Sequence, residues 1–218
     1  MLLPAQLFET VSMNEIMNTH IRMKTKQLLL AAVILATVSS CVISNYDSGY
    51  RWLSPAEKAK IRICNKAIDS LTNDGNVYLV NASQVEKYLS DKRYVVLYEC
   101  RPYCRSEECI TGKEAEEECH EHGLGFCLVA TSFPGIFSKT AGMKAPVLMT
   151  DTNGQKNDKH DNYINRFFTP LIGEIYNSKD FYQCFHLFYN GKYVKTYPTI
   201  KEAVADGKRY NTPLAHPS

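Results

Sequence analysis

The feature that most constrains this chain is an apolar run that leads directly into a cluster of cysteines. Residues Tyr94–Tyr98 are all apolar, which predicts a strand buried on both faces in the middle of a sheet. Four cysteines follow within one short span: Cys100, Cys104, Cys109 and Cys119. Thiols gathered at the exit of a strand indicate disulfide or metal chemistry at that place.

The rest of the chain alternates strand patterns with helix patterns. Strands are predicted at 77–80, 94–99, 126–131 and 147–150, and as a hairpin at 185–189 and 192–197 around Asn190-Gly191. Helices are predicted at 54–71, 83–89, 112–122, 163–175 and 199–204, with a short one after Gly135. Helices between strands imply parallel pairing. We therefore expect an α/β fold, a central mixed sheet flanked by helices that ends in a β-hairpin and a helix.

The N-terminal region indicates export. A short cationic segment at 23–26 precedes an apolar run at 28–38, and small residues then lead to Cys41. The run is too short to remain as a membrane-spanning helix, so we expect a cleaved leader. Its end, Val38-Ser39-Ser40-Cys41, resembles a bacterial lipobox. The resemblance implies cleavage before Cys41 and a thioether-linked diacylglycerol on its sulfur, so that acyl chains such as palmitate hold the protein on a membrane.

These signals divide the chain. Residues 1–22 are expected to lie upstream of the true start, 23–40 to form the lipoprotein signal peptide and 41–53 a lipidated tether. The α/β domain is expected at 54–210, with an insert near 151–180 and a tail at 211–218. Val42, rather than an aspartate, follows Cys41, which favours the outer membrane and a periplasm-facing domain. Eight cysteines suit such an oxidising compartment.

The cysteine loop and the order of elements resemble the thioredoxin fold. The segment Leu97-Tyr98-Glu99-Cys100-Arg101-Pro102-Tyr103-Cys104-Arg105 is similar to the redox loop of that family, with a spacing one residue longer than Cys-x-x-Cys. The resemblance implies that Cys100 attacks and Cys104 resolves, at a helix start where the dipole stabilises a thiolate. The supporting residues would be Arg101, Pro102 and Arg105, with Pro146 as the candidate for the family's cis-proline. Cys109 lies on another helical face and is the poorer partner for Cys104.

Two other uses of the cysteines stay open. With Cys41 lipidated, seven of the eight cysteines remain, an odd number. Cys64 and Cys127 occupy apolar periodic positions and are interpreted as core residues. Structural disulfides could draw on the remaining cysteines: Cys100, Cys104, Cys109, Cys119 and Cys184. A metal site would add His120 and His122, but the spacing matches no familiar zinc pattern.

The expected function is therefore a membrane-anchored thiol–disulfide oxidoreductase that acts on thiols or disulfides of envelope proteins. The alternative is a non-enzymatic, disulfide-stapled binding or structural lipoprotein on the same fold. No cofactor and no metal are expected. The formal net charge of +2 comes without a basic stripe, so nucleic acid is not an expected partner.

Overall fold

A computed structural model describes the chain from Ser48 to Asn211, except for residues 105–108, 152–159, 174–175 and 178–182. The expected leader, the lipidation site Cys41 and the tail lie outside the described residues, as does Arg105. The seven other cysteines lie within them, two in a disulfide and five as free thiols.

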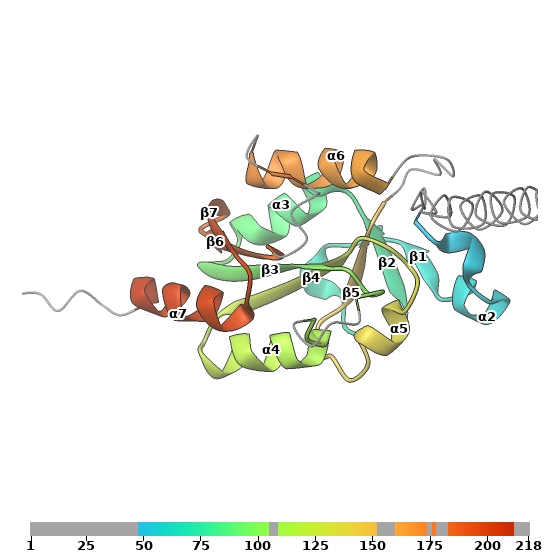
Figure 1. Ribbon diagram of the computed structural model, residues 1–218, viewed down its shortest axis with the longest axis horizontal. Coiled ribbons are helices and arrows are strands. Elements are labelled where there is room, and N and C mark those ends of the chain that lie inside the picture. Colours follow the sequence, from blue (N-terminus) through green and yellow to red (C-terminus); the bar gives the residue numbers. More distant parts are fainter. Residues whose placement is uncertain (1–47, 105–108, 152–159, 174–175, 178–182, 212–218) are drawn as a thin grey trace, which may run out of the picture. The chain divides into compact units, whose positions relative to one another are not determined.

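Seven strands form one mixed sheet in the order β1-β2-β5-β4-β3-β6-β7 (Figure 1). Their bounds are β1 Ile61–Ile63, β2 Val77–Val80, β3 Tyr94–Cys100, β4 Gly125–Ala130, β5 Val147–Thr150, β6 Phe185–Tyr189 and β7 Lys192–Tyr197. The strands from β1 to β3 in this order are parallel, whereas β6 is antiparallel to β3 and β7 to β6. The predicted mixed α/β sheet is confirmed.

Helices cover both faces of this sheet. Their bounds are α2 Pro55–Lys58, α3 Ala82–Ser90, α4 Gly112–Glu121, α5 Ile136–Lys139, α6 His160–Ile172 and α7 Ile200–Asn211, with 3-10 turns η1 Tyr50–Trp52 and η2 Ile68–Ser70. Figure 1 shows α3 and α6 on one face and α4 and α7 on the other. Each face has its own apolar core, one shared with α3 and α6 and one with α4 and α7.

Strand β3 is buried along its whole length, as its apolar sequence predicts. Because side chains alternate along a strand, Val95 and Leu97 enter the core beneath α3 and α6, while Val96, Tyr98 and Cys100 enter the core beneath α4. The strand therefore fixes the direction of every side chain up to the point where the cysteine loop begins.

The predicted C-terminal hairpin is also confirmed. Asn190 and Gly191 connect β6 to β7 with φ angles of 47° and 73°, both in the left-handed region. Such values at both central residues define a type I′ turn, whose twist matches that of the flanking strands. The hairpin places β6 against β3, so that Phe185 pairs with Tyr98 near the cysteine loop.

The predicted long helix at 54–71 is wrong beyond its first turn. The capping box of Ser54 and Glu57 forms, but the helix ends at Lys58, and Ile61–Ile63 pairs in parallel with β2. Spacings of three and four among apolar residues fit a helix, yet pairing with an open sheet edge satisfies the backbone of this short segment instead. The next helix, α3, is capped by Asn81 with Gln84 and begins at Ala82, one residue before the expected start.

Two boundaries of the expected domain also differ. Residues 48–53 were expected to belong to the tether, but Leu53 is buried and the backbone N–H of Phe133 donates to the Ser48 carbonyl at 2.8 Å. The insert contributes α6, which contains Pro170 in its last turn and therefore lacks the backbone hydrogen bond that a residue with an N–H would donate there. The final helix, expected at 199–204, extends to Asn211 as α7, and Gly207 lies inside it.

Helix α6 is part of the core, and a substitution at its residue Phe168 tests how much its packing contributes to stability. Its side chain is fully buried, and its ring stacks on Tyr176 with centroids 5.2 Å apart. We predict that Phe168→Ala lowers the free energy of unfolding by about 3–5 kcal/mol, because it removes a buried ring and leaves a cavity. Urea unfolding measures the change, and Lys87→Ala on the exposed face of α3 should stay within about 0.5 kcal/mol. A loss below about 1 kcal/mol for Phe168→Ala would mean that α6 is not packed as described.

Candidate functional site: a disulfide loop at the end of the central strand

Cys100 is the last residue of β3 and lies in the interior. Its side chain is 0% exposed, and its carbonyl accepts from the Thr131 N–H at 2.9 Å, which ties the ends of β3 and β4 together. Burial is the main cause that raises the pKa of the Cys100 thiol, to about 12. At neutral pH this thiol is protonated, which makes it a poor nucleophile.

The helix start that was predicted for the cysteine loop is not present. Residues 101–104 form a turn, closed by the Cys104 N–H donating to the Arg101 carbonyl at 3.0 Å. The next helix, α4, begins only at Gly112, after the capping box of Thr111 and Glu114. In the described part of the loop, Cys100 therefore ends a strand and precedes a turn, and it does not lie in the first turn of a helix.

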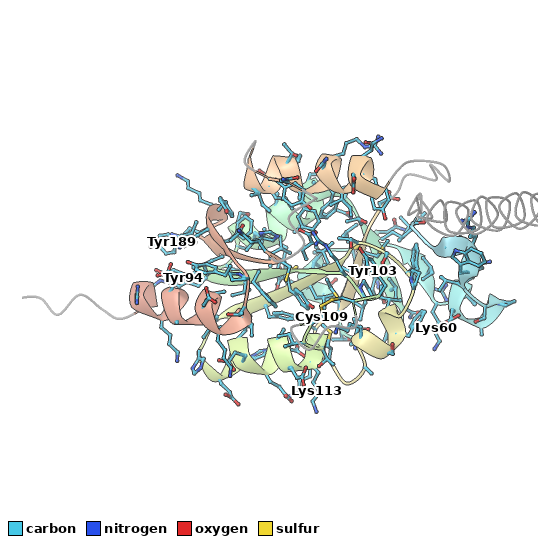
Figure 2. All side chains as sticks on the ribbon, viewed as in Figure 1. Lys60, Tyr94, Tyr103, Cys109, Lys113 and Tyr189 are labelled. Carbon is cyan, nitrogen blue, oxygen red and sulfur yellow. A yellow bond between two sulfur atoms is a disulfide. The ribbon has the colours of Figure 1, made fainter. Side chains whose placement is uncertain are left out.

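The structure joins Cys104 to Cys109 rather than to Cys100. The two Cα atoms of this disulfide are 6.0 Å apart, with a sequence separation of 5, within the ordinary range for a bridge. The prediction that Cys109 is the poorer partner for Cys104 assumed a helix through these residues. It is wrong, because residues 101–104 form a turn. Both cysteines are half-buried, and Figure 2 labels Cys109 and Tyr103 in this region.

Neighbouring elements hold the disulfide loop in place. The Tyr98 hydroxyl donates to the Ile110 carbonyl at 3.2 Å, and the Lys139 ammonium of α5 donates to the Cys109 carbonyl. Gly135 has a φ of 82°, and a Cβ there would lie 2.9 Å from the Pro102 carbonyl oxygen. Only glycine allows the two backbones to approach this closely in that conformation.

A pocket of about 330 Å³ opens beside the disulfide. Its lining residues are Pro102, Tyr103, Cys104, Thr111, Pro134, Gly135, Ser138 and Lys139. The lining combines apolar rings with hydroxyls and one ammonium group, and it includes a sulfur of the bridge. A polypeptide side chain that entered this pocket would meet Cys104.

A buried charged network lies on the other side of the same strand end. The Glu99 carboxylate accepts from the Arg101 guanidinium at 2.8 Å and from the Tyr176 hydroxyl at 3.1 Å, and it lies 3.3 Å from His186 Nε2. Burial alone would raise the pKa of Glu99, but the hydrogen bond with His186 and the charge of Arg101 outweigh it and hold the pKa below its ordinary value. Arg101 thus faces a carboxylate, not the thiolate that the sequence suggested.

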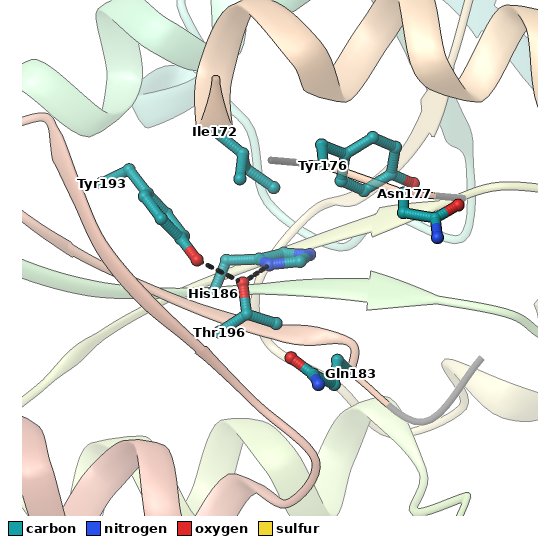
Figure 3. A pocket seen from close by; sticks show the side chains of 7 residues that line it. All are labelled: Ile172, Tyr176, Asn177, Gln183, His186, Tyr193 and Thr196. Atoms are coloured by element: carbon teal, nitrogen blue, oxygen red, sulfur yellow. Dashed lines mark hydrogen bonds between the residues drawn. The ribbon is translucent and has the colours of Figure 1, made fainter. Parts of the chain in front are cut away.

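His186 connects this network to the surface. Its Nδ1 lies 2.8 Å from the Thr196 hydroxyl, which also contacts the Tyr193 hydroxyl at 2.7 Å (Figure 3). These groups border a small pocket of about 110 Å³ that is lined by Ile172, Tyr176, Asn177, Gln183, His186, Tyr193 and Thr196. Sequence reasoning missed this network. The sequence does carry a signal for it, because Glu99 and His186 are charged or polar residues inside the otherwise apolar strands β3 and β6.

Other predicted site residues lie apart from the disulfide. Pro146 precedes β5, two residues before Leu148, which pairs with Val129 near the end of β4. Strand β4 separates β5 from β3 in the sheet, and the described residues contain no cis peptide bond. Cys119 is buried in α4, and burial raises the pKa of its thiol to about 12.

The remaining cysteines and histidines occupy several different places. Cys184 precedes β6 and lies beside the end of β3, where its carbonyl accepts from the Glu99 N–H at 2.8 Å. Its thiol is half-buried and free, with a pKa raised to about 12 chiefly by burial. Cys64 and Cys127 are buried core residues, as predicted. His120 and His122 lie near Glu116 and Glu118 at the end of α4, at 3.9 Å and 3.4 Å.

Removal of the Glu99 charge tests the buried network. We predict that Glu99→Gln lowers the free energy of unfolding at about pH 7 by about 3–5 kcal/mol, because Arg101 stays buried without its carboxylate. Since the folded-state pKa of Glu99 lies below its ordinary value of 4.5, its contribution is present above that pH and is lost as the pH falls through the folded-state pKa.

The variant should therefore lose less stability on acidification than the parent protein does. Urea unfolding from about pH 7 down to about pH 3 measures this difference. Glu86→Gln, at an exposed position of α3, is the matched control. Equal acid sensitivity of Glu99→Gln and the parent would contradict a charged Glu99.

Comparison of the chain with family models, with characterised proteins and with solved structures found no match. Within the described residues, no helix combines the length and apolar character needed to cross a membrane, and no group of three or more His, Cys, Asp or Glu side chains is arranged to hold a metal ion. The half-buried disulfide with its pocket, and the buried charged network beneath it, are the features from which a function is inferred.

Proposed function

We propose that this protein is a thiol–disulfide oxidoreductase of thioredoxin-like architecture, whose working pair is Cys104 and Cys109. The observation that carries the proposal is a half-buried disulfide beside a pocket, in the loop that follows the central strand. The succession β3, α4, β4, β6, β7 and α7, with the sheet order β4-β3-β6-β7, supports the thioredoxin-like description. Strand β5, between β2 and β4, and a disulfide that precedes α4 rather than capping it depart from that pattern.

The size of the disulfide loop favours a chemical role over a stapling role. Cross-linking restricts the unfolded chain more strongly when it closes a longer loop. A bridge with a sequence separation of 5 would contribute only about 2 kcal/mol by this effect. Position and accessibility then matter more than stabilisation, since the bridge lies where another protein's cysteine can reach it.

The pocket specifies which sulfur reacts. A substrate thiolate attacks Cys104 Sγ, forms a mixed disulfide and releases Cys109 as the thiolate, near the positive charge of Lys139. A second substrate thiolate then attacks the substrate sulfur of the mixed disulfide and releases Cys104. The substrate dithiol is oxidised to a disulfide, the bridge is reduced to two thiols, and exchange with a second protein disulfide regenerates it.

The proposed setting is the bacterial cell envelope. The lipobox-like sequence ending at Cys41 supports a lipid anchor, and an intramolecular disulfide suits an extracytoplasmic compartment. Envelope proteins with exposed thiols or disulfides are then the proposed substrates, and the outer membrane facing the periplasm is the proposed location.

A specific observation also favours the alternative, a non-enzymatic module stapled by its disulfide. Oxidoreductases usually hold a thiol of lowered pKa at a helix N-terminus, whereas residues 101–104 are a turn and Cys100 is buried. In that case the bridge would only restrain the loop, and the pocket would bind a partner without exchanging sulfur.

Exchange kinetics separate the two functions. We predict that the full chain oxidises a dithiol peptide through its bridge, that Cys104→Ser and Cys109→Ser abolish the reaction, and that Cys100→Ala and Cys119→Ala retain it within about threefold. The disulfide form of the peptide should trap Cys109→Ser as a mixed disulfide, in which the free Cys104 thiolate attacks one peptide sulfur and releases the other as a thiolate; mass spectrometry that locates this link at Cys104 would identify the sulfur that exchanges with substrate. If the parent chain shows no exchange and Cys104→Ser only loses about 2 kcal/mol of stability, the bridge is a staple.

A further inference from the structure

The start of the domain exposes large apolar side chains. Trp52 is 73% exposed, Ile63 72% and Tyr50 42%. Tyr50 and Trp52 both lie in η1, whereas Ile63 lies in the edge strand β1. Bulky apolar groups that gather on a surface mark a contact site more often than scattered ones do.

Basic side chains interleave with these aromatic rings. The Arg51 guanidinium lies 4.8 Å from the centroid of the Trp52 ring, and the Lys58 ammonium lies 5.4 Å from that of Tyr50. The Lys60 ammonium lies 5.2 Å from the ring centroid of Phe137 in α5. We call Tyr50, Arg51, Trp52, Lys58 and Lys60 the aromatic–basic surface. Figure 2 labels Lys60 at the end of the domain where α2 lies.

Acidic residues are few in the segment of the sequence that carries these cations. Between Ser48 and Lys60 the one acidic residue is Glu57, and its carboxylate accepts from the N–H and the hydroxyl of Ser54 at 2.8 Å and 2.7 Å. Glu57 is therefore committed to the helix cap. The aromatic–basic surface carries a net positive charge.

The surface is also held rigidly on the domain. The Tyr50 ring packs edge-on against Phe133 with centroids 5.5 Å apart, and Lys58 donates to the Arg51 carbonyl at 3.5 Å. Gly49 lies against the ring of Pro134, a residue that also lines the disulfide pocket. Whatever binds the surface therefore also fixes the position of the pocket.

We propose that the aromatic–basic surface docks on a membrane surface that carries anionic lipid headgroups. Trp and Tyr rings favour the headgroup level of a bilayer, where one end of the ring is apolar and the other is hydrated. Lysine and arginine next to them are attracted to anionic lipids.

Chain length makes the contact compatible with the proposed anchor. Seven residue steps separate Ser48 from Cys41, and they span at most roughly 25 Å when fully extended. In this respect alone the inference rests on the lipid anchor. Docking would hold the disulfide pocket at a constant distance from the bilayer, instead of letting the domain swing on its tether.

The protein contains a single tryptophan, Trp52, so its own fluorescence reports the contact. We expect the full chain, reconstituted in phosphatidylglycerol vesicles, to show a blue-shifted Trp52 emission that is quenched by lipids with brominated acyl chains. In phosphatidylcholine vesicles both effects should be weak. High salt should reverse them in phosphatidylglycerol, because it screens charge attraction at the surface.

Charge variants test whether the cations of the aromatic–basic surface attract it to anionic lipid, or whether the surface only lies near the bilayer. The triple variant Arg51→Gln, Lys58→Gln, Lys60→Gln should reduce the ratio of docked to undocked protein roughly a hundredfold, at about fivefold per cation. The matched control Lys192→Gln, Lys195→Gln, Lys201→Gln changes exposed cations of β7 and α7 and should leave the ratio unchanged.

Three results would overturn the proposal. The first is a water-exposed Trp52 emission on both kinds of vesicle. The second is equal quenching in the triple variant and the parent. The third is shielding of Trp52 only after envelope proteins are added, which would assign the surface to a protein partner. Because the readout is fluorescence, these outcomes do not depend on thiol–disulfide exchange.

Discussion

The burial of β3 between two apolar layers is the constraint on which the rest of the structure depends. The strand is covered by α3 and α6 on one face and by α4 and α7 on the other, and it pairs with β4 and β6 at its two edges. Strict alternation then gives each side chain one face only. At the carboxyl end of the strand, Cys100 enters the core beneath α4, and Glu99 enters the core beneath α6, where Arg101 and His186 offset its loss of hydration.

This constraint decides where sulfur chemistry can take place. A thiol inside a packed core stays protonated and out of reach of another protein, so Cys100 is unsuited to exchange. The chain leaves the sheet through a turn, and the first half-buried sulfur is that of Cys104. The buried network helps to position the loop, because the charge of Glu99 holds Arg101, the first residue of the loop. The proposed exchange is therefore assigned to the loop, whose base is held in place by the end of the strand.

Most strands of the sheet could be predicted from the sequence, but the arrangement of the site could not. Two-sided apolar runs identified β3 and β4, and Asn190-Gly191 identified the hairpin, because these signals are local and strong. The segment around Ile61 was misread, since three residues that pair with an edge carry no period that distinguishes strand from helix. The disulfide partner of Cys104 depends on the conformation of residues 101–104. These residues were predicted to be helical, but they form a turn, and Cys104 is joined to Cys109. The contact between Glu99 and His186 joins positions far apart in the chain, and no local pattern reveals such a contact.

In the native protein Cys100 is a buried free thiol, while Cys104 and Cys109 are joined in a disulfide. Alkylation of the native, unreduced full chain, followed by denaturation, a second alkylating reagent of different mass and peptide mapping, tests this arrangement directly. We expect that Cys100 takes only the second label and that the peptides of Cys104 and Cys109 remain linked until a reductant is added. A Cys100–Cys104 linkage, or labelling of Cys100 in the native protein, would contradict it.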